Sequence, residues 1–244
     1  MPVTEYLIRN AELYPDEVAL VELNPDEKDT RRTTWKEFDL IQPSANMPYR
    51  REITWSVFNE KANRFANMLI SRGVKKGDKV AILMYNCLEW LPIYFGVLKT
   101  GAIAVPFNFR YDSDEIYYCA ELAQVDVIVF GFAFIGRIEV NAERLLRGRL
   151  LIYVGDNCPS FAESYHELVA DCSSKEPDVK ITEDDYGAIY FSSGTTGFPK
   201  AILHKHQSLT QAAIMEQKHH STGRDDTFLC IPPPVSYTHL RAHE

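Results

Sequence analysis

The residues best suited to chemistry lie in one short stretch, which reads YFSSGTTGFPK from Tyr190 to Lys200. An apolar lead-in is followed by four hydroxyl residues and two glycines. Glycines let a backbone bend so that successive N–H groups converge on one anion, and hydroxyl groups add further donors. The lysine adds a positive charge on a long stem. The stretch therefore predicts a loop that binds a polyphosphate, with these candidate cofactor-binding residues: Ser192, Ser193, Gly194, Thr195, Thr196, Gly197 and Lys200.

A flexible linker and a Walker-type loop both fit this stretch less well. A flexible linker normally has polar flanks, whereas this stretch follows an apolar run. A Walker-type loop has adjacent glycine and lysine, followed by serine or threonine. Here Phe198 and Pro199 separate Gly197 from Lys200, and Ala201 follows the lysine. The loop is therefore not of the Walker type.

Alternating strand and helix patterns surround the loop. Thr54 is a predicted N-cap of a helix that Gly73 ends, and Ser113 is a predicted N-cap of a later one. Further helical patterns cover residues 88–100, 139–146 and 161–169, and residues 171–180 are a polar connector. The predicted buried strands are 80–83, 102–105, 127–129 and 188–190, and another strand begins at Arg149.

Such alternation is typical of an α/β fold in which a mostly parallel sheet has helices on both faces. Ligands of these sheets bind at the carboxyl ends of the strands. A strand that ends at Phe191 would deliver the candidate loop to that edge.

Composition and charge limit the class of protein. The chain has 244 residues and a formal net charge of -8, which argues against a nucleic-acid surface. Its five cysteines are scattered, which indicates reduced thiols in a cytoplasmic protein. We expect no transmembrane segment, no targeting segment and no metal site. His239 and His243 have the spacing of metal ligands on a helix but lack a third ligand.

A short repeat lies near the N-terminus. The residues Thr-Trp-x-x-Phe occur twice between residues 31 and 58. Two copies are too few for a solenoid. Either the first copy is a local insertion, with residues 45–49 in a surface loop, or the similarity is a coincidence.

The stretch SSGTTGFPK, preceded by TEDDYGAIYF, resembles the phosphate-binding signature of the adenylate-forming (AMP-binding) superfamily. The stretch LPIYFGVLKTGAIAVPFNFRYDSDEIYYCAELAQVDVIVF is similar to the corresponding part of fatty acyl-CoA synthetases. The opening EYLIRNAELYPDEVAL resembles their N-terminal helix and first strand. The resemblance covers about residues 3–233, so the fold it implies is the first half of the large N-terminal domain of such an enzyme.

The resemblance also implies roles for particular residues. Residues 193–197 would wrap the β- and γ-phosphates of ATP, with Lys200 alongside. His206, in HKHQSL, matches a histidine that usually follows this loop, although the residue alone favours a histidine that begins a helix. Ala201 stands where most members have glycine, a departure that we expect the loop to tolerate.

Enzymes of this kind join a carboxylic acid to ATP and then pass the acyl group to coenzyme A. The implied partners are therefore a small carboxylic acid, in particular a fatty acid, together with ATP, Mg²⁺ and coenzyme A. Donors around the leaving pyrophosphate would stabilise its growing charge.

The chain departs from the family pattern at its end. The downstream segments that hold the Mg²⁺-binding glutamate, the ribose-binding aspartate and the catalytic lysine are absent, so no catalytic residue is assigned here. We interpret residues 1–235 as a truncated AMP-binding domain and residues 236–244 as an atypical tail. The parent would be an acid–thiol ligase, and this chain is expected to be inactive alone, without the C-terminal half. The alternative is a non-catalytic nucleotide-binding or structural fragment, and a kinase is disfavoured.

Overall fold

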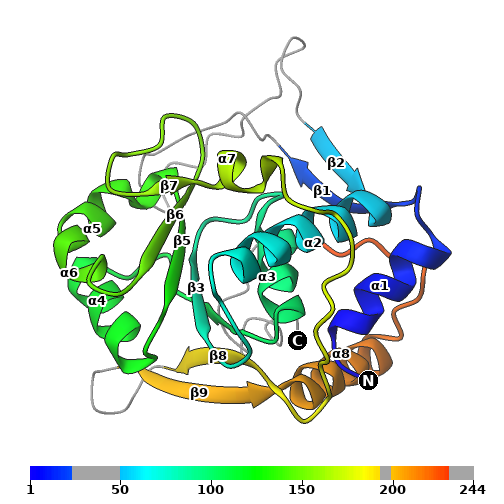
Figure 1. Ribbon diagram of the computed structural model, residues 1–244. Helices are drawn as coiled ribbons and strands as arrows, with labels where there is room; N and C mark the ends of the chain where they lie inside the picture. The colour runs from blue at the N-terminus through cyan, green and yellow to red at the C-terminus, as the bar shows by residue number, and fades with distance from the viewer. Residues whose placement is uncertain (24–49, 193–198, 231–244) are drawn as a thin grey trace, which may run out of the picture.

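A seven-stranded sheet forms the centre of the computed structural model, which describes residues 1–23, 50–192 and 199–230 (Figure 1). The strand order is β7-β6-β5-β3-β4-β8-β9. Neighbouring strands are parallel except β8 and β9, which form an antiparallel pair. The strands are β3 (Lys79–Leu83), β4 (Ile103–Pro106), β5 (Val127–Gly131), β6 (Leu150–Val154), β7 (Glu163–Ser164), β8 (Tyr186–Ser192) and β9 (Lys200–Lys205).

Helices cover both faces of the sheet (Figure 1). Along β3, Val80 and Ile82 face the layer of α2 (Trp55–Ser71) and α3 (Trp90–Lys99). Ala81 and Leu83 face the opposite layer, because side chains alternate along a strand. That layer contains α4 (Ser113–Leu122), η1 (Phe132–Phe134), α5 (Ile135–Glu139) and α6 (Ala142–Leu145). The predicted α/β fold is therefore confirmed.

The N-terminal segment forms a smaller unit beside α2 (Figure 1). Helix α1 (Thr4–Leu13) leads into β1 (Val18–Leu23), which pairs antiparallel with β2 (Arg50–Thr54). Thr54 is the N-cap of α2, as predicted, and its side chain accepts a hydrogen bond from the Val57 amide. The second copy of the repeat is thus the start of α2, while the first copy lies outside the described residues.

Several local details differ from the sequence-based expectations. The N-cap of α4 is Asp112 and not Ser113, because Asp112 and Glu115 form a reciprocal capping box. The helix expected at 139–146 is replaced by α5 and α6, which Val140 and Asn141 separate. The helix expected at 161–169 is shorter, since β7 precedes α7 (Tyr165–Ala170).

Candidate functional site

The β8–β9 hairpin places two of the candidate residues opposite each other. β8 runs buried from Gly187 to Phe191 and emerges at Ser192, which is exposed. Ser192 and Lys200 are register partners across the hairpin. Directly opposed residues in an antiparallel pair have Cα atoms about 5 Å apart. The candidate residues Ser193, Gly194, Thr195, Thr196 and Gly197 lie outside the described residues, which stop at Ser192 and resume at Pro199.

Aromatic packing holds the end of β8 in place. The Phe191 ring lies 5.8 Å from the Phe107 ring and 6.4 Å from the Tyr111 ring, both in edge-on arrangements. On the other face, the Tyr190 hydroxyl lies 3.0 Å from the Tyr94 hydroxyl. Both faces of the strand are therefore fixed within two residues of Ser192.

The loop after β4 lies at the same carboxyl edge and is also fixed. Arg137 donates hydrogen bonds to the carbonyl oxygens of Phe109, at 2.5 Å, and Tyr111, at 3.1 Å. The Arg110 guanidinium lies 5.5 Å from the centre of the Phe109 ring, and the residue is exposed. Arg110 is thus a second exposed cation at the edge that carries Lys200. It was not among the residues predicted from the sequence, although its position just after a predicted strand is a usable signal.

The structure does not bring His206 to this edge. His206 is the first residue of α8 (His206–His220), and its amide donates to the Asp185 carbonyl at the opposite end of the hairpin. From Tyr186 to Ser192 the strand extends by about 20 Å. The interpretation as a histidine that begins a helix is the one that the structure supports.

The surroundings of His206 are those of a neutral core residue. The side chain is fully buried, and neither ring nitrogen has a hydrogen-bond partner among the described residues. Burial lowers the pKa of His206 to about 4, while Asp185 acts in the opposite direction and Lys76 reinforces the lowering. The imidazole is therefore uncharged at neutral pH.

Metal-binding, membrane-spanning and disulfide features are not found in the described part of the chain. Within residues 1–23, 50–192 and 199–230, no group of three histidine, cysteine, aspartate or glutamate side chains could hold a metal ion. None of the described helices has the length and apolar character required to cross a membrane. All five cysteines fall in these ranges and are free thiols.

Comparison with known proteins identifies relatives over most of the chain. The AMP-binding enzyme family model matches residues 7–240. The long-chain-fatty-acid–CoA ligase FadD13 of Mycobacterium tuberculosis (strain ATCC 25618 / H37Rv) is 32% identical over 174 residues, which are 71% of this chain and 33% of the relative. A crotonobetaine/carnitine–CoA ligase of Citrobacter koseri is 30% identical over 75% of this chain and 36% of the relative. The chain thus spans about a third of the length of these relatives.

Solved structures with the same fold include an acyl-CoA synthetase of Brucella canis, with a TM-score of 0.77, 19% identity and coverage of 96% of this chain and 39% of that one. The N-terminal domain of FACL13 from Mycobacterium tuberculosis has a TM-score of 0.66 and 24% identity, and covers 92% of this chain and 48% of that one. At this level of identity the likeness concerns the fold. It agrees with the expected N-terminal domain of an adenylate-forming enzyme.

Proposed function

Because the chain belongs to the AMP-binding enzyme family, we propose that it is the phosphate-binding part of an ATP-dependent acyl-CoA synthetase. In the proposed reaction a carboxylate oxygen attacks the α-phosphorus of ATP, the bond to the β-phosphate breaks, and pyrophosphate leaves. The thiol of coenzyme A then attacks the acyl carbonyl, and AMP departs. The proposed substrate is an aliphatic acid, in particular a fatty acid, and the name of the Mycobacterium tuberculosis ligase supports that choice.

The hairpin geometry is the observation that carries the proposal. Ser192 and Lys200 are paired at the carboxyl edge of the sheet, so the strands on both sides of the glycine and hydroxyl run of residues 193–197 reach that edge. Parallel sheets bind ligands at this edge. In the proposal, residues 193–197 and the adjoining Ser192 supply N–H and hydroxyl donors to the phosphates, and Lys200 supplies charge. His206 is not included in this group, because it lies at the other end of the hairpin.

The proposed reaction also requires Mg²⁺. Mg²⁺ usually binds through substrate phosphates and one or two carboxylates, and it would assist the departure of pyrophosphate. The described ranges contain no group of three or more metal-ligating side chains, and we propose no Mg²⁺ ligand among them. The work of the chain's own residues is therefore to bind and orient the phosphates.

A second candidate function is a non-catalytic nucleotide-binding fragment. Both candidates require phosphate binding, and they differ in whether the acid is activated.

The experiment is a titration of pyrophosphate into the labelled 244-residue chain, followed by NMR at the backbone amides of residues 192–200. We expect these amides to shift and Lys200→Ala to weaken binding by about threefold, with a smaller salt dependence, because one charge is removed. Gly194→Val should weaken it further, because a β-branched residue resists positive φ and crowds a bound phosphate.

The matched control is Lys205→Ala. Lys205 is a lysine at the opposite end of the same strand, where it pairs with Asp184 at 3.0 Å. Its replacement removes the same charge and should leave pyrophosphate binding unchanged. Amides that do not move in a folded wild-type chain would remove the phosphate-loop assignment.

A further inference from the structure

The connector of residues 171–185, between α7 and β8, is held to the domain largely by polar contacts, although Cys172 also packs against the apolar core. None of its residues is buried. It runs across α2 and then turns into β8, the strand that ends at Ser192. Because apolar burial contributes little here, the path of the connector depends on the hydrogen bonds that it receives.

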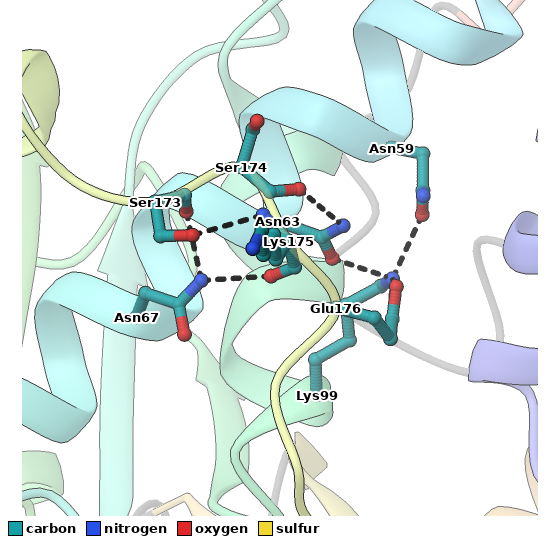
Figure 2. A network of polar contacts seen from close by, with 8 residues as sticks. All are labelled: Asn59, Asn63, Asn67, Lys99, Ser173, Ser174, Lys175 and Glu176. Atoms are coloured by element: carbon teal, nitrogen blue, oxygen red, sulfur yellow. Dashed lines mark hydrogen bonds and ion pairs between the residues drawn. The ribbon is translucent and has the colours of Figure 1, made fainter.

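Asparagines at four-residue spacing on α2 supply many of these bonds (Figure 2). Asn63 Nδ2 donates to the Ser174 carbonyl at 3.0 Å. Asn67 Nδ2 donates to the carbonyls of Ser173, at 2.7 Å, and Lys175, at 2.9 Å. Residues four apart lie on one face of a helix, so this face of α2 binds the main chain of the connector.

Lys99, the last residue of α3, links the asparagines of α2 to the connector. Its side chain is 1% exposed, and its ammonium contacts Asn59 Oδ1 and Asn63 Oδ1, each at 2.7 Å. The same ammonium contacts both carboxylate oxygens of Glu176, at 2.7 and 2.6 Å (Figure 2). A buried charge that loses its partner is strongly destabilising, so the buried lysine holds Glu176, and with it the connector, at a defined place.

A second attachment lies close to β8. Lys76 Nζ donates to the Lys180 carbonyl at 3.2 Å and to Asp185 Oδ2 at 2.6 Å. The Asp185 carboxylate also accepts from the Thr182 amide at 2.7 Å. Burial acts to raise the pKa of Asp185, but these hydrogen bonds outweigh it and lower the pKa. The carboxylate therefore stays charged, and β8 begins at the next residue.

We propose that Lys99, Glu176 and the asparagines Asn59, Asn63 and Asn67 form a polar clasp that positions β8 and the phosphate loop at its end. The link to phosphate binding rests on the proposed function. A strand whose register slips by one residue turns every side chain to the other face. In β8 such a slip would exchange the faces of Tyr190 and Phe191 and displace Ser192. Lys76 and Asp185 fix where the chain reaches the sheet, and the clasp holds the segment that leads to them. The clasp therefore opposes the slip together with this second attachment.

The test compares Glu176→Ala with Asp178→Ala in the full chain. Both are exposed acidic residues of the connector, and Glu176 is the one that contacts Lys99. Glu176→Ala should speed hydrogen exchange at the amides of residues 171–185 and of β8, and should weaken pyrophosphate binding by about threefold to tenfold, a range usual for indirect coupling. Asp178→Ala should change neither quantity.

Two further variants separate positioning from general destabilisation. Glu176→Gln retains an oxygen for the Lys99 ammonium, so it should restore most of the protection and affinity that Glu176→Ala loses. Lys99→Met should reproduce the faster exchange, because it removes the charge from the same site. Should Lys99→Met fail to fold, the pair of Glu176 variants decides the matter alone.

The outcomes distinguish this proposal from the proposed function. If exchange in β8 is unchanged in Glu176→Ala, the clasp does not position the strand and the inference is overturned. If exchange rises but pyrophosphate affinity stays at the wild-type value, the claim that the clasp positions the phosphate loop is overturned, while the proposed function stands. If wild type binds no pyrophosphate, the proposed function fails, and the exchange data alone decide whether the clasp positions β8.

Discussion

The hydroxyl groups of Tyr94 on α3 and Tyr190 on β8 lie 3.0 Å apart in the interior. Tyr94 is 8% exposed and Tyr190 is 5% exposed, so water does not readily replace either partner. Burial is the main cause that raises the pKa of both phenols. The two groups therefore remain neutral and join the helix layer to the strand that ends at Ser192.

This pair predicts a non-additive response to mutation. Tyr94→Phe leaves the Tyr190 hydroxyl buried without that partner and should lower the free energy of unfolding by about 1–3 kcal/mol. Tyr190→Phe should do the same to Tyr94. The double variant should be more stable than the sum of the two losses indicates, because no orphaned hydroxyl remains. Urea unfolding monitored by circular dichroism measures all four proteins, and strictly additive losses would refute the coupling.

A close approach of α2 and α3 gives the second prediction. A Cβ atom at Gly96 would lie 2.8 Å from the Ala62 carbonyl oxygen and 2.9 Å from Phe65 Cδ1. Gly96→Ala should therefore push the helices apart and lower the free energy of unfolding by about 1–3 kcal/mol, as overpacking usually does. Thermal unfolding measures the change.

Gly136 provides the control for this substitution. It lies in α5, and a Cβ atom there meets no atom of the described residues within 4 Å. Gly136→Ala should be neutral or stabilising by up to about 1 kcal/mol, because alanine is the better helix former. Equal losses at both positions would show that the helix contact at Gly96 is not the cause.

The central strands could be predicted from the sequence because their residues are apolar on both faces. β3, β5 and β8 contain the predicted segments 80–83, 127–129 and 188–190, and β4 differs from 102–105 by one residue. Strands that are covered on both sides need continuous apolar runs, and such runs are visible without knowledge of their partners.

β9 could not be predicted in the same way. It lies at the edge of the sheet, and its residues alternate little in exposure. Its pairing with β8 follows from the long-range structure. The polar clasp also depends on long-range structure, since Asn63 and its acceptor Ser174 are 111 residues apart. Asparagines at four-residue spacing predict a polar helix face, but they do not identify what that face binds.

The candidate site was predictable in part. The hairpin register places Ser192 beside Lys200, two residues that the sequence assigns to one loop. The phosphate-binding role of that loop stays a prediction. The position of His206 was not predictable from its nearness in sequence, because an antiparallel strand carries the chain back across the sheet. Four to six strand residues extend far enough to move a side chain from the carboxyl end of the neighbouring strand to its amino end.

Catalysis gives the third prediction. The chain spans about a third of the two ligases compared, and we propose that essential groups lie in the remainder. Loss of such groups removes several kcal/mol of transition-state stabilisation. The 244-residue chain should therefore show no ATP–pyrophosphate exchange with a series of fatty acids, measured beside the full-length Mycobacterium tuberculosis ligase as a positive control. Robust exchange by the chain alone would contradict this expectation.

The last prediction concerns acid stability and His206. The pKa of this histidine is lowered by burial to about 4, from an ordinary value of 6.5. At acidic pH the unfolded chain therefore binds a proton at this residue more readily than the folded chain does. Its contribution to stability is complete above pH 6.5 and is lost as the pH falls from about 6.5 to about 4. The loss amounts to roughly 3 kcal/mol at one shifted group.

His206→Leu tests this origin of the acid sensitivity. Both ring nitrogens of His206 lack hydrogen-bond partners in the described part of the chain, so leucine removes the titration without orphaning another polar group. The free energy of unfolding of the variant should fall less than that of wild type between pH 6.5 and 4. His166→Leu is the control, because His166 is exposed on α7. The unfolding curve of this variant is measured beside those of wild type and His206→Leu. Parallel curves for wild type and His206→Leu would show that other groups, such as Asp185 beside Lys76, govern the acid transition.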